Sequence, residues 1–182
     1  RFNKDQLNLL INKPNIMKKV LLLTLIVTFF GCETLSDPSY GGVFTGGSNT
    51  YKLQQGSDDY ATMIKDVVLG YADGNFEEII VNFSDSVTRR EPGNVYKVAP
   101  SIERWKSFKE NFDSINRNLT SVMAVKVNDD YSFVDALFSQ QVYKGDSVTM
   151  SRDFERYWIN HETNKIVSIA FVSEEYGDED EN

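Results

Sequence analysis

Apolar and polar residues follow two different periods along the chain, and the change falls near Leu119. Over residues 57–83 and 101–115 the apolar residues recur every three or four positions, which is the spacing of a helix face. From residue 120 to residue 172 they alternate with polar residues, which is the spacing of a half-buried strand. Three long alternating runs separated by turn signals predict an antiparallel meander as the main sheet.

Three helices are expected before the meander. The first begins at Ser57 or Asp58, both of which favour a helix N-cap, and it stops at Asp73-Gly74-Asn75. The second is short and follows directly, over residues 76–83. The third is capped by Ser101 and carries a strongly aromatic face made of Ile102, Trp105, Phe108, Phe112 and Ile115. That face fits core packing, and it also fits the wall of a ligand pocket.

Short strands are expected over 87–90 and 95–98, on either side of the turn formed by residues 91–94. Within the meander, alternation separates the side chains onto two faces. In the run 148–159 one face carries Arg152, Arg156 and Trp158, and the other carries Asp153 and Glu155. The run 131–143 is apolar on both faces at its centre, which predicts that both faces are covered there.

The order of elements, helices first and a meander last, predicts an α+β fold with the helices gathered on one face of a curved antiparallel sheet. The chain also resembles the nuclear transport factor 2-like superfamily, which includes ketosteroid isomerase-like and polyketide cyclase-like (SnoaL-like) proteins. The residues that carry the resemblance are 71–76 (YADGNF), 83–87 (FSDSV) and 165–171 (KIVSIAF), within a region of roughly 58–173. It implies three N-terminal helices packed on a strongly curved sheet that forms a cone with a pocket, and a homodimer through the open sheet face.

The N-terminal part has the pattern of a secretory signal. Lys18 and Lys19 precede an apolar run over 20–30, which is too short to span a bilayer, and Gly31 stands before the single cysteine, Cys32. A buried core helix is the alternative interpretation. Residues 29–32 (FFGC) resemble the lipobox of bacterial lipoproteins, which implies that Cys32 is lipidated and becomes the mature N-terminus. The expected location is the bacterial cell envelope, with the chain anchored to a membrane outside the cytoplasm.

These features predict five segments. Residues 1–16 are an upstream extension, 17–31 a signal peptide, 32–56 a flexible Gly- and Ser-rich tether, 57–173 the folded domain and 174–182 an acidic disordered tail. The formal net charge of the whole chain is −8. An acidic chain without clustered Lys and Arg is not expected to bind nucleic acid.

Three acids are candidates for a catalytic base. The resemblance implies that Glu91 occupies the position of the family's base, while Val67 replaces its tyrosine and Asp153 or Glu155 corresponds to its acidic hydrogen-bond donor. Asp135 interrupts an apolar face, where it could be a pocket acid or could pair with an arginine on the neighbouring strand. The ligand-binding candidates are Trp105, Phe108, Asp135, Arg152, Arg156 and Trp158.

No cofactor and no metal is expected. The chain has one cysteine and one histidine, and His161 falls in the turn 160–164, where an exposed loop position is expected. Two functions remain open. The first is a non-catalytic lipoprotein whose pocket or sheet face binds a small, apolar ligand or a partner protein. The second is an isomerase-, cyclase- or hydratase-like enzyme that uses a pocket carboxylate as its base.

Overall fold

The computed structural model describes residues 39–46 and 49–176. The expected extension over 1–16, the signal peptide over 17–31 and the lipidated Cys32 lie outside these residues. The last part of the expected acidic tail, 177–182, also lies outside them.

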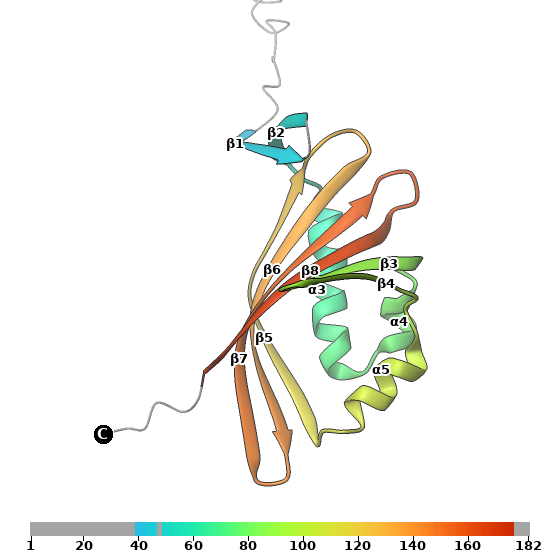
Figure 1. The fold of residues 1–182 in the computed structure, drawn as a ribbon, viewed down its shortest axis with the longest axis vertical. Helices are drawn as coiled ribbons and strands as arrows, with labels where there is room; N and C mark the ends of the chain where they lie inside the picture. Colours follow the sequence, from blue (N-terminus) through green and yellow to red (C-terminus); the bar gives the residue numbers. More distant parts are fainter. Residues whose placement is uncertain (1–38, 47–48, 177–182) are drawn as a thin grey trace, which may run out of the picture. The chain divides into compact units, whose positions relative to one another are not determined.

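One sheet of eight strands forms the body of the described chain (Figure 1). Its order is β1-β2-β5-β6-β7-β8-β3-β4. All neighbours are antiparallel except β3 and β8, which run parallel. The strands are β1 (Ser39–Gly46), β2 (Asn49–Gln55), β3 (Phe83–Glu91), β4 (Asn94–Val98), β5 (Ser114–Lys126), β6 (Tyr131–Lys144), β7 (Ser147–Asn160) and β8 (Lys165–Tyr176).

Strands β5 to β8 confirm the meander that the alternating pattern predicts, with each turn where the turn signals fall. Two register shifts bend it. One lies in β5 between Leu119 and Ser121, and one lies in the β7–β8 ladder next to Trp158. Because an extra residue on one strand increases the local twist and bends the strand, these shifts curve the sheet around the helices.

The longest helix, α3 (Asp58–Asp73), packs in the hollow of the sheet. Ser57 is its N-cap, and the Ser57 hydroxyl accepts a hydrogen bond from the Asp59 backbone N–H at 3.1 Å. Gly74 ends the helix with a positive φ of 86°, a conformation that glycine adopts without strain. Both ends therefore confirm the helix that the sequence predicts.

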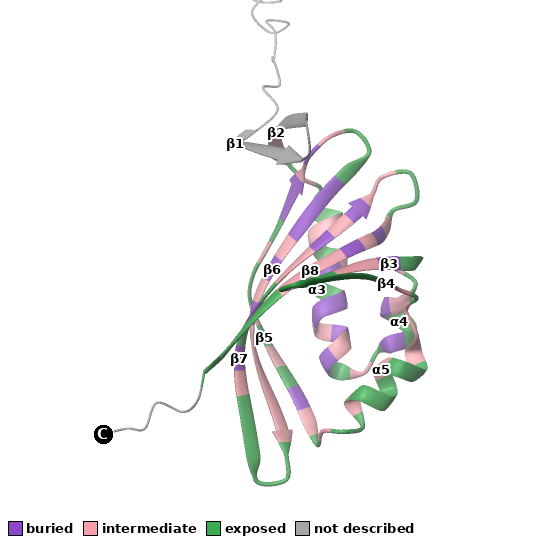
Figure 2. Ribbon diagram, in the orientation of Figure 1, coloured by how far each residue is buried: buried purple, intermediate pink, exposed green. Residues whose placement is uncertain are grey.

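Two shorter helices, α4 (Phe76–Ile80) and α5 (Ile102–Lys109), lie beside α3 on the same side of the sheet (Figure 1). No residue of α5 is fully buried, as the green ribbon in Figure 2 shows. Ile102 and Trp105 are partly buried against the core, and two basic side chains also hold the helix in place. Lys106 Nζ lies 2.6 Å from a Glu77 carboxylate oxygen of α4, and Lys109 Nζ donates to the Ala72 carbonyl of α3 at 2.6 Å.

The core lies between α3 and the inner face of the sheet, which we define as the face that carries Val134, Ala136, Phe138, Tyr157 and Ile159. Ile64, Val67 and Val68 of α3 are almost fully buried against it. The opposite, outer face carries Phe133, Asp135, Arg156 and Trp158, and a second apolar cluster there joins Val125, Val127 and Phe133 with Leu53 of β2. Both faces of β6 are therefore covered at Phe133 and Val134, near its start, whereas the apolar pattern predicts such cover at the centre of the run.

The third helix ends six residues earlier than the aromatic pattern suggests. The Asn111 side-chain amide donates to the carbonyls of Ser107 and Phe108, which caps the helix end. The Asp113 backbone N–H then bonds to Tyr143 of β6, and β5 begins at Ser114. Ile115 is consequently a buried strand residue and not part of the helical face.

The strands also extend further toward both termini than the pattern indicates. Residues 39–46 and 49–55 pair as the strands β1 and β2, although the Gly- and Ser-rich composition of 32–56 favours a tether without regular structure. Backbone pairing explains the difference, since β2 joins β5 through Gln54 and Gln55, and a ladder needs no apolar side chains. At the other end β8 continues to Tyr176, past the expected domain boundary at 173.

Candidate functional site: a pocket between helices and sheet

A cavity of about 490 Å³ lies between the three helices and the inner face of the sheet. This volume falls within the range of small-molecule sites, roughly 300–1,000 Å³. We call it the cone pocket. Its apolar and aromatic wall includes Val67, Tyr71, Ile79, Phe83, Val87, Trp105, Phe108, Tyr157, Ile169 and Phe171. Its charged groups are Arg89, Arg104, Arg117, Asp153 and Glu155.

Trp105 of α5 is the centre of the aromatic wall. Its ring lies 5.4 Å from the ring of Phe83 and 6.1 Å from that of Tyr71, both in edge-to-face geometry. Such pairs add favourable quadrupole contacts to the burial of apolar surface. The aromatic face that the sequence predicts on the third helix therefore does line a pocket, although Phe108 at its rim is half exposed.

A tyrosine and a glutamate form a hydrogen-bonded pair inside the pocket. The hydroxyl of Tyr157 donates to the Glu155 carboxylate, and both side chains project from β7 onto the inner face. Burial raises the pKa of Tyr157 well above its usual value, and the negative charge of Glu155 raises it further. Tyr157 is therefore a neutral hydrogen-bond donor, and Glu155 is an acceptor held by it.

Arg117 of β5 is fixed by several partners at once. Its Nε donates to the Gln140 side-chain oxygen at 2.8 Å, and its Nη1 donates to the Val68 carbonyl at 3.3 Å. The guanidinium also stands 4.8 Å from the ring centre of Tyr71. Burial raises the pKa of Tyr71, while the charges of Arg117 and Arg89 lower it. Arg117 thus supplies a positive charge near the Tyr157–Glu155 pair without being able to move freely.

Asp153 is the one catalytic candidate from the sequence that the structure places in the pocket. Its side chain is buried, and Ser151 Oγ donates to one carboxylate oxygen at 2.9 Å. Trp105 and Phe108 line the pocket as well, and their expected role in binding a ligand stays a prediction.

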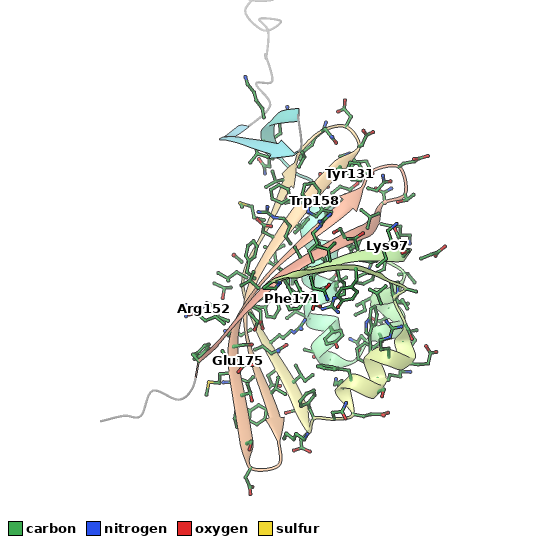
Figure 3. All side chains as sticks on the ribbon, in the orientation of Figure 1. Lys97, Tyr131, Arg152, Trp158, Phe171 and Glu175 are labelled. Atoms are coloured by element: carbon green, nitrogen blue, oxygen red, sulfur yellow. The ribbon has the colours of Figure 1, made fainter. Side chains whose placement is uncertain are left out.

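The other four ligand-binding candidates lie on the outer face. Asp135 accepts two hydrogen bonds from Arg156, at 2.6 Å from Nε and 2.8 Å from Nη2, so the cross-strand pair is the alternative that the structure supports. Arg152 is exposed and projects away from the helices in Figure 3. Trp158 packs beside Phe133. The expectation that Asp135, Arg152, Arg156 and Trp158 contact a pocket ligand is wrong for the cone pocket, because strand alternation turns all four side chains away from it.

Glu91 ends β3, next to the turn into the edge strand β4, and does not line the cone pocket. Its carboxylate accepts a hydrogen bond from the Tyr96 hydroxyl at 2.6 Å and stands 3.4 Å from Arg89 Nη2. These contacts stabilise the hairpin of β3 and β4. They do not place Glu91 against a ligand in the cone pocket.

His161 is partly buried, although its turn position suggests an exposed side chain. Its Nε2 lies 2.9 Å from the hydroxyl of Ser132, and its Nδ1 lies 2.7 Å from the Asp129 carbonyl. The Tyr60 ring stacks on the imidazole at 5.8 Å. This network joins the β7–β8 turn to the β5–β6 turn and to the first turn of α3.

Sequence reasoning missed most of the polar groups of the pocket. The sequence gives no reason to single out Arg89, Arg117 or Tyr157 as pocket residues, because each lies on an ordinary alternating strand. The available signal was the alternation itself, which groups Tyr157 with Glu155 and Asp153.

Within 39–46 and 49–176, no group of three or more His, Cys, Asp or Glu side chains is arranged to hold a metal ion. The helices in those ranges are also too short or too polar to cross a membrane.

No protein-family model and no curated protein matches the sequence. Solved structures do match. The Kfla4162 protein from Kribbella flavida aligns over 66% of this chain and 94% of its own, with a TM-score of 0.55 and 12% identity. A scytalone dehydratase-like protein from Novosphingobium aromaticivorans covers 65% and 85%, with a TM-score of 0.52 and 8% identity. Bal32a, from a soil-derived mobile gene cassette, covers 64% and 89%, with a TM-score of 0.52 and 10% identity. The protein has the nuclear transport factor 2-like cone fold.

Proposed function

We propose that the protein binds a small, mostly apolar molecule in the cone pocket. The observation that carries this proposal is the cavity of about 490 Å³ with an aromatic wall and a few grouped polar side chains, which is the usual composition of a small-molecule site. The solved structures that match are too distant in sequence to identify the ligand, so the proposal rests on the residues of this chain.

Titration with the neutral fluorescent dye N-phenyl-1-naphthylamine tests this proposal. The two tryptophans form a matched pair, because Trp105 lines the pocket and Trp158 lies on the outer face. We expect saturable binding that Trp105→Ala weakens and Trp158→Ala leaves nearly unchanged. An absence of binding, or an equal loss in both variants, would contradict the proposal.

Catalysis by Glu155 is a second candidate function. It is favoured by the position of this carboxylate in a largely apolar cavity beside a neutral tyrosine donor and a fixed arginine, because a base and a donor facing one substrate are what proton transfer at carbon requires. Glu155 replaces Glu91 and Asp135 as the base in this hypothesis, and Asp153 lies next to it on the same face. The dehydratase-like name of one matching structure is compatible with such chemistry.

A generic substrate can test for a base without knowledge of the natural one. 5-Nitrobenzisoxazole opens to a coloured phenolate when a carboxylate removes its ring proton, and it is small enough for the cavity. We expect turnover above the buffer rate that Glu155→Gln reduces by at least about tenfold, the lower end of what general-base catalysis contributes. Glu162→Gln, in the exposed β7–β8 turn, is the control. Equal rates in both variants would leave ligand binding as the function.

We further propose that Cys32 carries a lipid that anchors the domain to a membrane of the bacterial cell envelope, outside the cytoplasm. The lipobox-like sequence of residues 29–32 after an apolar run supports this proposal. Labelling with a radioactive fatty acid in bacterial cells should fail in a Cys32→Ala variant. Persistent labelling of that variant would refute it.

A homodimer through the outer face of the sheet is the partner arrangement that we propose. Exposed apolar side chains such as Met123, Phe154 and Val172 support it. Sedimentation that finds only a monomer at high protein concentration would exclude this dimer.

A further inference from the structure

Within the part of the chain that the structure describes, the last five residues of β8 have a neighbouring strand on one side only. On that side, β7 pairs with β8 up to Tyr176. On the other side, β3 pairs with β8 as far as Arg90 and Ala170, and the chain then turns back into β4. We call residues 172–176 the β8 edge. It is the exposed, green end of β8 in Figure 2.

An open strand edge presents backbone N–H and C=O groups that the sheet itself does not use. Proteins protect such edges with a proline, a β-bulge, a covering segment or charged side chains. The β8 edge contains no proline, and the register shift of the β7–β8 ladder lies at Trp158, away from it. No described segment covers the β8 edge, since all five residues are exposed. Its charged side chains therefore decide which strand can be added.

The charge of the β8 edge is negative. It carries Glu174 and Glu175, while its partners on β7 add one base, Arg152, and one acid, Asp153. The sequence continues with four more acids at 178–181. A second copy of this chain is disfavoured as the partner, because two such edges in antiparallel pairing would set glutamates opposite one another. A basic strand is attracted by the same charges.

Side chains along the β8 edge alternate between the two faces of the sheet. Ser173 lines the cone pocket, so Ser173 and Glu175 lie on the inner face. Val172, Glu174 and Tyr176 lie on the outer face, where Val172 is 57% and Tyr176 41% exposed. An added strand alternates in the same way. A base beside Glu174 is then flanked, two positions away on each side, by residues that can contact these two apolar side chains.

We propose that the β8 edge binds an extended, basic segment of a partner protein by strand addition. The segment has a lysine or arginine beside Glu174, an apolar residue two positions away on each side of it, and a second base beside Glu175. Backbone hydrogen bonds provide the affinity, and the side-chain pattern provides the specificity. This function does not depend on a ligand in the cone pocket.

Fluorescence anisotropy with a synthetic peptide tests this proposal. Thr-Val-Lys-Lys-Lys-Val-Thr-amide, labelled with tetramethylrhodamine, carries the expected pattern in either strand direction. We expect saturable binding to the full chain that Glu174→Gln/Glu175→Gln weakens by at least about threefold, as the loss of two exposed charge pairs does. Glu110→Gln/Glu162→Gln removes two exposed acids elsewhere and should bind as the wild type does.

A second peptide separates strand addition from simple charge attraction. Thr-Pro-Lys-Pro-Lys-Pro-Lys-Thr-amide has the same charge, but proline lacks the backbone N–H and does not fit a sheet ladder. We expect it to bind at least about tenfold more weakly, since backbone hydrogen bonds are lost. The first peptide alone should slow hydrogen exchange in residues 172–176. Equal binding of both peptides, equal weakening in both double variants, or unchanged exchange at the β8 edge would overturn the proposal.

Discussion

Tyr157 shows how burial decides the chemistry of a single residue. It is 3% exposed, and its hydroxyl has the Glu155 carboxylate as its partner. Ionisation would place a phenolate against a carboxylate in an apolar surrounding, and that is why the pKa of Tyr157 is raised well above its usual value. Tyr157 is consequently a donor over the whole physiological pH range.

This pKa shift predicts a pH dependence of stability. An unfolded tyrosine ionises near pH 10, whereas Tyr157 in the folded state keeps its proton to higher pH. Its contribution is complete below pH 10 and is lost as the pH rises through the folded-state pKa. The stability advantage of the wild type over Tyr157→Phe should therefore fall by about 1.4 kcal/mol between pH 9 and pH 11 in urea unfolding.

A second tyrosine provides the control for this experiment. Tyr131→Phe removes an exposed tyrosine at the start of β6 and should show the same change with pH as the wild type. A constant difference between wild type and Tyr157→Phe up to pH 11 would mean that the Tyr157 hydroxyl is not buried against Glu155.

At the scale of elements, strand alternation was the most informative feature of the sequence. It predicted β6, β7, β8 and the second half of β5, and it correctly separated Asp153 from Arg152 and Arg156. It could not tell which face the helices cover, because both faces of β7 mix polar and aromatic residues. The sequence therefore predicts the sheet well and assigns only Trp105, Phe108 and Asp153 to the pocket correctly. The end of α5 was missed because the Asn111 cap competes with an aromatic pattern that continues into β5.

The pairing of β6 and β7 on the outer face supports a prediction about ion pairs. Asp135 and Arg156 form a half-buried bidentate pair, and the guanidinium also stands 4.0 Å from the ring centre of Phe133. Asp135→Leu should lower the free energy of unfolding by about 1–3 kcal/mol, since it leaves a partly buried charge unpaired.

The double variant distinguishes this explanation from a simple loss of packing. Asp135→Leu/Arg156→Leu should recover much of the stability, because two apolar side chains can replace a buried ion pair. Glu77→Leu, which breaks the exposed pair with Lys106, should cost much less than Asp135→Leu. Additive losses in the double variant, measured by urea unfolding, would show that the two side chains do not act as a pair.

For the whole molecule, the helices and the sheet share one core. The cluster around Val68, Phe138 and Ile159 is continuous from α3 across the inner face of the sheet, and Trp105 packs against it. Trp158 packs against the separate outer cluster on the same strands. The two tryptophans therefore report on the two sides of one sheet.

A sheet with a shared core should unfold in a single transition. Single-tryptophan variants, Trp158→Phe and Trp105→Phe, each leave one fluorescent reporter. Their urea midpoints, after correction for the small stability change of each substitution by circular dichroism, should coincide with the loss of secondary structure. An earlier transition for the Trp105 signal would indicate that the helix layer separates from the sheet before the strands unfold.

The parallel contact between β3 and β8 has a further consequence for biosynthesis. Thr88 of β3 pairs with Ser168 of β8. This ladder therefore cannot form until the ribosome has synthesised the whole meander between the two strands. Ile169 and Phe171, which close the pocket beside Arg89, arrive with that same last strand. A nascent chain can assemble α3 and the β5–β6 hairpin early, but it holds no ligand until its final strand has emerged and joined β3.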